Sequence, residues 1–497
     1  MSTSLYILAI DQGTTGTRAI VYDHSGRMRG SAHQEFHQYY PQPGWVEHDP
    51  LEIWKTTVSV IDRSLSKAGI SFLRIASVGI TNQRETTVLW ERKTGRPVSR
   101  AIVWQDRRTA QICAGLKARG LEGLFRERTG LVLDPYFSGT KIQWMLNTIS
   151  QLRRKAARGD VLFGTIDTWL LWNLTGGKMH ATDVTNASRT LLLNIKKICW
   201  DRELLKILRI PSAILPEVHP SSFSFGKSVA IASLKQGVPI NAMAGDQQAA
   251  LYGQGCYHSG EAKNTYGTGC FLMTNEGKSY RKPPRGLLGT LACDAQGKPA
   301  YALEGAVFIG GAVVQWLRDG LGFIKRASET EKIARQIKDT GGVIIVPAFT
   351  GLGSPYWNPN VRGAIFGLTR GTARGHLIKA ALESIAFQTA DVFEAMGRSL
   401  GKKLRSLKVD GGATTNDYLM QFQADLLGVP VLRSDRPEST AWGAAKLAGV
   451  ACGFWKDLRD ADRTVRYKKF APRMSRRVRL AKREAWRSAV RTLLAQP

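Results

Sequence analysis

A run of small, hydroxylated and charged residues near the N-terminus has the composition of a phosphate-binding turn. The apolar stretch 5–11 ends in Asp11 and is followed by Gln-Gly-Thr-Thr-Gly-Thr-Arg. Glycines such as Gly16 let the backbone approach an anion, and amides with the hydroxyls of Thr14 and Thr15 can donate to its oxygens. Arg18 adds a charge-assisted donor, and Asp11 is suited to hold Mg²⁺ through water. The run predicts a phosphate-binding hairpin with a cation beside it.

Two later segments predict a nucleotide site by the same chemistry. The sequence KNTYGTGCF (263–271) places Thr268 between two glycines and two apolar runs, which repeats the strand–turn–strand pattern. The sequence VDGGA (409–413) closes an apolar run before a helical stretch. A base and ribose can lie flat on a glycine backbone such as that of Gly412, and Asn416 on the next turn can bond the adenine edge.

Polar residues that follow other apolar runs predict a substrate site. Arg84 and Glu85 come after the run 75–81 and supply a donor and an acceptor from adjacent positions, with each expected to be the other's charge partner. Loop residues after a buried strand often carry function, although a surface ion pair is the commoner fate of such a dipeptide. Asp246, after the run 240–245, is either a general base or a helix cap. Trp104 is either a site wall or core.

The elements that position these residues alternate between two types. Strand-like runs at 5–11, 75–81, 240–246, 343–349 and 407–412 are separated by helical stretches such as 376–396. This order predicts α/β layers. The chain has 497 residues, which is too long for one compact core, so we expect two domains, 1–253 and 254–497. Each domain would contribute one hairpin with glycines at its tip, and the two hairpins would hold a phosphate chain between them.

The net charge of +30 is partly concentrated in the last 37 residues. We expect a terminal amphipathic helix that packs on the body, with a solvated arginine face and no binding to nucleic acid. The apolar positions of this helix are predicted to be Met474, Val478, Ala481, Ala485 and Leu493. The longest apolar run, 305–314, is well short of the roughly 18 residues that span a membrane, so we expect no stable membrane insertion.

Several long segments resemble the glycerol kinases of the FGGY carbohydrate kinase family, within the actin-like ATPase superfamily. The resemblance runs from about residue 6 to residue 454 and implies two ribonuclease-H-like domains with ATP in the cleft between them. It also implies cytoplasmic, Mg²⁺- and ATP-dependent phosphorylation of glycerol to sn-glycerol 3-phosphate in glycerol catabolism. The segments include AIDQGTTGTRAIVYD (9–23), PGWVEHDP (43–50), GITNQRETTVLW (79–90), LDPYFSGTK (133–141), AGDQQAALYGQ (244–254) and VDGGATTNDYLMQFQADLLG (409–428).

The resemblance implies roles for individual residues. It places Asp246 as the general base and sets three further groups around it. Many relatives have Ser where this chain has Gly16, so one side-chain donor to the nucleotide is expected to be missing. The nucleotide residues are Thr14, Thr15, Gly16, Arg18, Thr268, Gly311, Gln315, Gly412 and Asn416; the glycerol residues are Arg84, Glu85, Tyr136, Asp246 and Gln247; and the residues flanking the glycerol carbons are Trp104 and Phe271.

The resemblance also bears on regulation and assembly. Some bacterial glycerol kinases bind fructose 1,6-bisphosphate on a Gly-Gly-Thr-Arg loop, and here Gly237 stands at the place of the arginine, with Lys235 nearby. A flexible lysine is a poor substitute for a bidentate guanidinium, so we expect little sensitivity to the bisphosphate. Members of the family are commonly dimers or tetramers, so the resemblance implies that this chain forms a homodimer or homotetramer. A kinase for another polyol or ketose, or a non-catalytic nucleotide-binding protein, is the alternative function.

Overall fold

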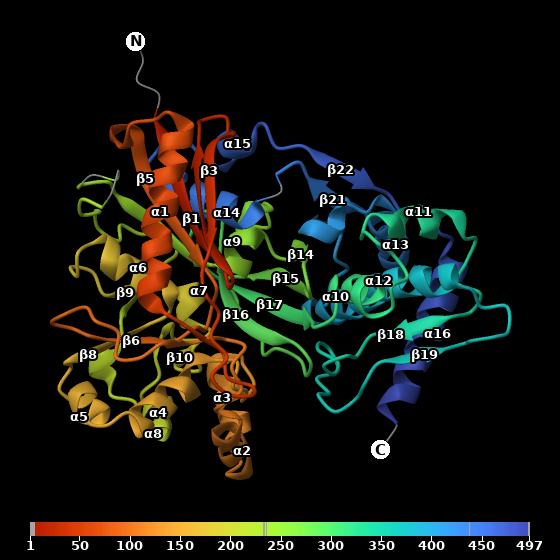
Figure 1. Ribbon diagram of the computed structural model, residues 1–497, viewed down its shortest axis with the longest axis horizontal. Helices are drawn as coiled ribbons and strands as arrows, with labels where there is room; N and C mark the ends of the chain where they lie inside the picture. Colours follow the sequence, from red (N-terminus) through yellow and green to blue (C-terminus); the bar gives the residue numbers. More distant parts are fainter. Residues whose placement is uncertain (1–4, 232–233, 235, 437, 496–497) are drawn as a thin grey trace.

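The computed structural model describes residues 5–231, 234, 236–436 and 438–495, and it is built around two mixed β-sheets (Figure 1). The first sheet has the order β13-β5-β1-β2-β3 and the second the order β16-β17-β15-β14-β20-β21-β22. The strands of the first are β1 (Tyr6–Gln12), β2 (Gly16–Tyr22), β3 (Met28–Glu35), β5 (Ile75–Asn82) and β13 (Ile240–Gly245). Those of the second are β14 (Ala262–Tyr266), β15 (Cys270–Gly277), β16 (Leu288–Cys293), β17 (Pro299–Val307), β20 (Leu407–Asp410), β21 (Val431–Ser434) and β22 (Tyr467–Phe470).

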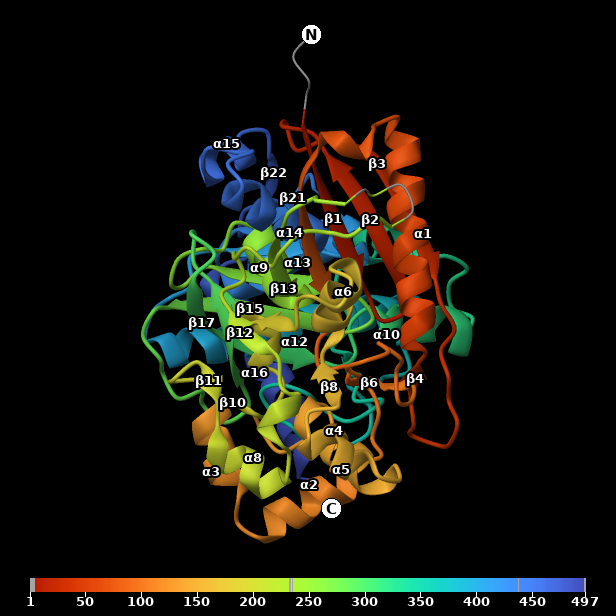
Figure 2. The ribbon, with the colours of Figure 1, turned by 90° about the vertical axis from the view of Figure 1, so that its left-hand side faces the viewer.

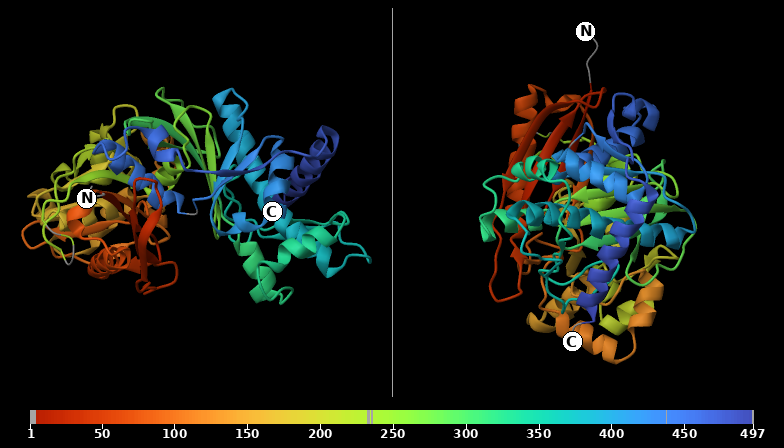
Figure 3. Two further views of the ribbon diagram at one scale, coloured as in Figure 1. Left: turned by 90° about the horizontal axis from the view of Figure 1, so that it is seen from above. Right: turned by 90° about the vertical axis from the view of Figure 1, so that its right-hand side faces the viewer.

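The two sheets repeat one topology. In the first, β1, β2 and β3 are antiparallel neighbours, and β1 pairs parallel with β5, which pairs parallel with β13. In the second, β14, β15 and β17 form the antiparallel part, while β14, β20 and β21 are parallel. The prediction of two α/β units of one kind, each opened by a hairpin, is therefore confirmed. Seen from above, the units lie side by side in Figure 3.

Helices cover both faces of the first sheet, so its strands are apolar on both sides. Leu8 and Ile10 of β1 pack in one core with Val60 and Leu65 of α1 (Pro50–Ala68). The alternate residue Ile7 packs with the helix α14 (Ser439–Ala451) on the other face. A helix from the C-terminal half of the chain therefore covers one face of the N-terminal sheet. The contact crosses the domain boundary predicted at residues 253/254. The boundary itself stays a prediction.

The second sheet is covered by α12 (Arg374–Leu400) and α13 (Asp417–Leu427), and α16 (Arg476–Leu494) packs on these helices. The terminal helix is the one that the sequence predicts, but its packed face was predicted wrongly in part. Val478, Ala481 and Ala485 are exposed, whereas Trp486 and Val490 are buried with Leu493. Acidic side chains of α12 select this face, because Trp486 Nε1 donates to Asp391 at 2.6 Å.

Most of the remaining elements come between β5 and β13 in the sequence. In Figure 2 most of these lie below the first sheet. The helices are α2 (Ala110–Ala118), α3 (Glu122–Thr129), α4 (Ser138–Thr148), α5 (Leu152–Ala157), α6 (Ile166–Leu174), α7 (Val184–Ala187), α8 (Arg202–Leu208), α9 (Asp246–Gly253), α10 (Ala312–Gln315), α11 (Glu329–Gln336) and α15 (Leu458–Asp462). The short strands are β4 (Glu47–His48), β6 (Val88–Glu91), β7 (Ala101–Ile102), β8 (Val161–Gly164), β9 (Ala181–Asp183), β10 (Leu193–Asn194), β11 (Cys199–Trp200), β12 (Glu217–His219), β18 (Ile344–Val346) and β19 (Ala364–Phe366). Within the described residues, no helix combines the length and apolar character needed to cross a bilayer.

Candidate functional site

The first predicted phosphate loop is the tight connection between β1 and β2. Gly13 N donates to the carbonyl of Gly16 at 2.9 Å, which closes the turn and leaves Thr15 exposed at its tip. Trp104, after β7, donates its indole N–H to Thr14 Oγ1 at 2.9 Å. The ring predicted to flank the substrate therefore holds a hydroxyl of the loop predicted to bind phosphate.

A buried polar chain supports this loop from behind. Gln83 Nε2 donates to Gln12 Oε1 at 3.0 Å and lies 3.4 Å from His48 Nδ1. The other ring nitrogen, Nε2, is 2.6 Å from Gln38 Oε1, and Gln38 Nε2 donates to the carbonyl of Thr14 at 3.1 Å. Burial lowers the pKa of His48 to about 3, so the ring is neutral and can donate on one side while it accepts on the other. Sequence reasoning missed this histidine, which lies in the segment 43–50.

The absence of a side chain at Gly16 is explained by two residues of β3, His33 and Gln34. A Cβ at this position would lie 2.5 Å from Nε2 of His33 and 2.9 Å from the carbonyl oxygen of Gln34. The side chain of His33 can move, but the carbonyl belongs to the strand that pairs with β2. A side chain at this position would therefore require both the His33 ring and the backbone of β3 to shift.

Charged groups surround the end of β1. Arg18 forms an ion pair with Glu438, the residue that precedes α14. Burial, followed by the carboxylates of Asp246 and Glu438, raises the pKa of Asp11 to about 7, and Arg18 opposes them. A cation beside these carboxylates would offset their mutual repulsion and the effect of burial. The described residues contain no cluster of three or more metal-ligating side chains, so Mg²⁺ here would keep mostly phosphate and water ligands, as it usually does.

The predicted nucleotide residues of the second half converge on one loop. Gly310 N donates to the carbonyl of Thr268 at 2.8 Å, and Gly311 N donates to that of Gly267 at 2.8 Å. Gly311 is the N-cap of α10, whose last residue, Gln315, is exposed. The turn that contains Gly412 lies against the same loop, because β14 and β20 are paired neighbours.

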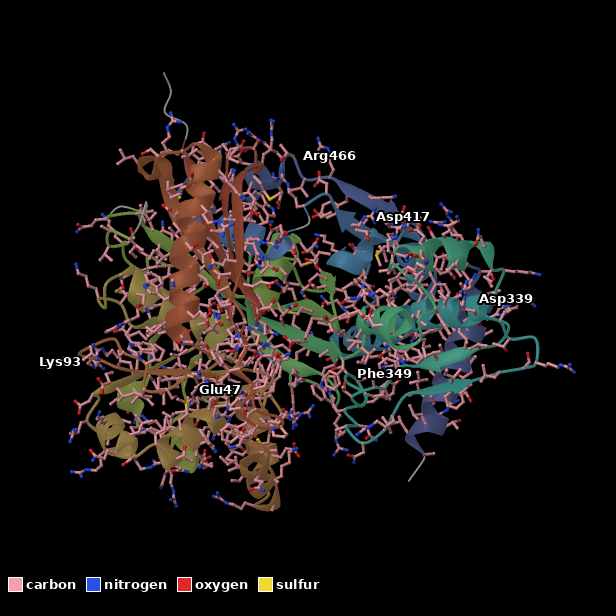
Figure 4. The ribbon with its side chains drawn as sticks, viewed as in Figure 1. Glu47, Lys93, Asp339, Phe349, Asp417 and Arg466 are labelled. Carbon is pink, nitrogen blue, oxygen red and sulfur yellow. The ribbon has the colours of Figure 1, made fainter. Side chains whose placement is uncertain are left out.

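Asn416 has a structural role that the sequence prediction did not include. Its side-chain oxygen accepts from Leu419 N at 2.9 Å and caps α13, and its amide donates to Thr330 Oγ1 at 3.2 Å. Asp417 beside it pairs with Lys468 and Arg433 on the outer side of the second half, where it is labelled in Figure 4. Contact between Asn416 and adenine stays a prediction, and it would have to use or displace these bonds.

The predicted substrate residues meet where β5 and β13 end side by side. Asp246 is the first residue of α9, and its carboxylate lies 3.1 Å from Nε of Arg84. Gln247 N donates to the same carboxylate at 2.7 Å. The side chain of Asp246 is 33% exposed, while that of Arg84 is 2% exposed. A solvent-accessible carboxylate therefore faces a fixed, buried guanidinium.

The expected pairing of Glu85 with Arg84 is present but long, and it is not the closest contact of either side chain. Arg84 Nε is 4.0 Å from Glu85 Oε1, whereas Arg189 Nε donates to that oxygen at 2.6 Å. Arg189 lies after α7, and both residues are buried. Glu85 has a φ of 64°, a conformation that costs free energy in a residue with a side chain and that the surrounding contacts must hold in place.

Two aromatic rings border the same cluster. The rings of Trp104 and Tyr136 meet edge to face, with centroids 5.4 Å apart, and the guanidinium of Arg189 lies 5.7 Å from the centre of the Tyr136 ring. The buried Lys141 of α4 donates to the carbonyls of Pro135 and Tyr136 at 2.6 Å each. Sequence reasoning missed this lysine, which anchors the loop that presents Tyr136.

The second sheet supplies one face to this cluster. Lys263, Met273 and Glu304 are paired across three strands, and Thr265, Phe271 and Ala306 form the next row of the same register. Rows two residues apart share a face, so Phe271 lies on the face that carries Glu304 and Lys263. Glu304 pairs with Arg84, and Lys263 Nζ donates to Gln247 Oε1 at 2.5 Å. Sequence reasoning missed both charged residues.

Two cavities lie elsewhere. One of about 360 Å³ is next to Lys93, at the left edge of Figure 4, and one of about 520 Å³ lies between α12 and α16. Neither is lined by a predicted site residue. Gly237, the position relevant to the bisphosphate, has a φ of 100° in an exposed turn, and Lys235 is outside the described residues.

Comparisons with known proteins agree over nearly the whole chain. Models of the N-terminal and C-terminal domains of the FGGY family of carbohydrate kinases match residues 6–253 and 262–452. A glycerol kinase of Shewanella sp. strain ANA-3 is 58% identical over 91% of this chain and 92% of its own, and one of Carboxydothermus hydrogenoformans is 55% identical over 98% of each. The crystal structure of Plasmodium falciparum glycerol kinase with ADP has a TM-score of 0.94, with 35% identity and 99% of each chain covered.

Proposed function

Because the chain belongs to the FGGY family of carbohydrate kinases, we propose that it transfers the γ-phosphoryl group of ATP to a terminal hydroxyl of glycerol. The products are sn-glycerol 3-phosphate and ADP. The observation that carries this proposal is the 3.1 Å pair between the accessible carboxylate of Asp246 and the buried guanidinium of Arg84. Relatives that are 55–58% identical over more than nine-tenths of the chain are glycerol kinases.

The substrate pocket of the proposal mixes polar partners with aromatic walls, which suits a small triol. Arg84 offers N–H donors, Glu85 and Asp246 offer carboxylate acceptors, and Gln247 offers both. Trp104 and Phe271 face the carbon chain, and Tyr136 closes one side. Close contact of the Trp104 and Tyr136 rings supports this arrangement.

Asp246 acts as the general base in this mechanism. It accepts the proton of the terminal hydroxyl as the hydroxyl oxygen attacks the γ-phosphorus in line with the departing β-phosphate oxygen. Arg84 holds the hydroxyl beside the carboxylate. The amides of residues 13–16, the hydroxyls of Thr14 and Thr15 and the guanidinium of Arg18 neutralise charge on the phosphates. Arg18 must exchange part of its ion pair with Glu438 for this contact.

The adenosine moiety lies on the second half, against Thr268, Gly311, Gln315, Gly412 and Asn416. Mg²⁺, when bound, supplies positive charge to the β- and γ-phosphates, and Asp11 would hold it through water. The raised pKa of Asp11, caused by burial and by the carboxylates of Asp246 and Glu438, supports a cation at this position. Domains 1–253 and 254–497, self-association as a dimer or tetramer, and insensitivity to fructose 1,6-bisphosphate are further parts of the proposal.

A coupled assay of ADP release with glycerol, ribitol and xylulose tests the function. We expect turnover with glycerol that far exceeds turnover with the pentitol or the ketose, and little ADP without an acceptor. Faster turnover of ribitol or xylulose would assign another substrate. Nucleotide binding without ADP release from any acceptor would favour a non-catalytic protein.

A further inference from the structure

A buried carboxylate from the second half of the chain enters the proposed substrate site. Glu304 lies on β17, and its side chain is 1% exposed. Its Oε2 accepts from Arg84 Nη1 at 2.5 Å, and its Oε1 accepts from Arg84 Nη2 at 3.2 Å. Such two-point pairing fixes both the position and the plane of a guanidinium.

The other donors of Arg84 are oriented by this contact. Nη1 also donates to Gln248 Oε1 at 3.3 Å, so the η end of the guanidinium is turned toward Glu304 and Gln248. Nε then faces the carboxylate of Asp246. The direction that Arg84 presents to the base is set from the second sheet, 220 residues away in the sequence.

The same carboxylate balances a second buried arginine. Arg189 Nη2 donates to Glu304 Oε1 at 3.0 Å, while Arg189 Nε donates to Glu85. Arg84, Arg189, Glu85 and Glu304 are each at most 3% exposed and sum to zero charge. Both arginines counteract the effect of burial and lower the pKa of Glu304 to about 2, so it is ionised at any working pH.

We propose that Glu304 is a positioning residue for the substrate site: it holds Arg84 in the orientation that directs Nε to Asp246 and leaves the η nitrogens engaged elsewhere. The inference rests on the proposed function. Without this charge the buried cluster carries one excess positive charge, and the η nitrogens of Arg84 lose their anionic partner. Arg84 can then leave the orientation in which Nε faces Asp246, and it no longer holds the substrate hydroxyl beside that carboxylate.

The test compares Glu304→Gln with Glu304→Asp, which keeps the charge on a shorter side chain, and with Glu276→Gln. Glu276 is a buried carboxylate at the far end of the neighbouring strand β15, so it is the matched control. KM for glycerol, KM for ATP, kcat and ADP release without glycerol are measured for each variant, with thermal unfolding to establish folding.

For Glu304→Gln we expect a loss of about 10–10² in kcat/KM for glycerol, the scale of a small misplacement of a binding group. KM for ATP and glycerol-independent ADP release should stay near the wild-type values. Glu304→Asp should be intermediate, and Glu276→Gln should match wild type.

Folded Glu304→Gln protein that behaves like Glu276→Gln would overturn the inference. So would equal losses for glycerol and ATP. If Glu304→Gln does not fold, Glu304→Asp decides: wild-type KM for glycerol in that variant overturns the inference, and a selective rise supports it. Wild-type protein that does not phosphorylate glycerol would instead remove the proposed function, before any variant is compared.

Discussion

Trp104 Nε1 and Thr14 Oγ1 are joined by a 2.9 Å hydrogen bond, which connects the ring predicted to flank glycerol with the loop predicted to bind ATP phosphates. The two residues are 90 positions apart in the sequence. The bond orients the hydroxyl of Thr14 and the edge of the indole. It therefore links the proposed glycerol site directly to the proposed phosphate site.

Trp104→Phe should weaken the use of both substrates, because it removes this donor while keeping an aromatic wall. A neutral hydrogen bond contributes about 0.5–1.5 kcal/mol, so we expect about a 2- to 12-fold rise in KM for ATP. Thr14→Val should have a similar effect, and the double variant should be little worse than either one. Fully additive losses in the steady-state constants would show that the bond is not used.

Asp246→Asn should reduce kcat by about 10²–10⁴-fold, the usual effect of removing a general base. Nucleotide affinity, measured by calorimetric titration of ADP, should change little, because the loops that contact phosphate stay intact. Turnover close to that of wild type would remove Asp246 from the mechanism.

Stability should depend on pH through Asp11. Burial and the neighbouring carboxylates raise its pKa from 3.8 to about 7 in the folded protein. The folded state therefore holds a proton that the unfolded chain releases above pH 4, and this contribution to the free energy of unfolding is lost as pH rises from about 4 to about 7. Urea unfolding of wild type and Asp11→Asn in metal-free buffer measures it.

The stability difference between wild type and Asp11→Asn should fall across that pH window and become constant above it. A difference that does not change with pH would mean that Asp11 titrates normally in the folded protein.

Gly16→Ser should impair folding or ATP use despite the added hydroxyl, because its Cβ would meet the carbonyl of Gln34 and the ring of His33. Gly115→Ser in α2 is the control, since a Cβ there has no heavy atom within 4 Å. Thermal unfolding and KM for ATP are the readouts. Adding His33→Ala should restore part of the loss, and a fully active Gly16→Ser protein would contradict this explanation of the glycine.

Trp486→Ala should destabilise the second half by about 3–5 kcal/mol, as for other buried aromatic residues. The ring is fully buried, stacks on Phe387 with centroids 5.1 Å apart and donates to Asp391. Leu480→Ala, at a 53% exposed position of the same helix, should have little effect. Equal midpoints in denaturant for the two variants would mean that α16 contributes little to stability.

The sequence by itself determined the local structure of this protein, namely its turns, its hairpins and the order of its strands and helices. A turn such as 13–16 depends on residues that are neighbours in the chain, so its glycines and threonines predict the hairpin between β1 and β2 directly. The same holds for the β14–β15 hairpin, for the order of strands and helices, and for Asp246 at the start of α9. Motifs long enough to resemble one family then indicated the reaction.

Only the tertiary structure decided which charges meet. Arg84 and Glu85 are adjacent in sequence, yet each takes its closest partner from elsewhere: Glu304 for Arg84 and Arg189 for Glu85. These pairs depend on the register of β17 and on how the second sheet packs against the loops of the first. The packed face of α16 was likewise selected by Asp391 on α12. Contacts between distant segments follow from packing of the whole chain, which no local pattern of residues encodes.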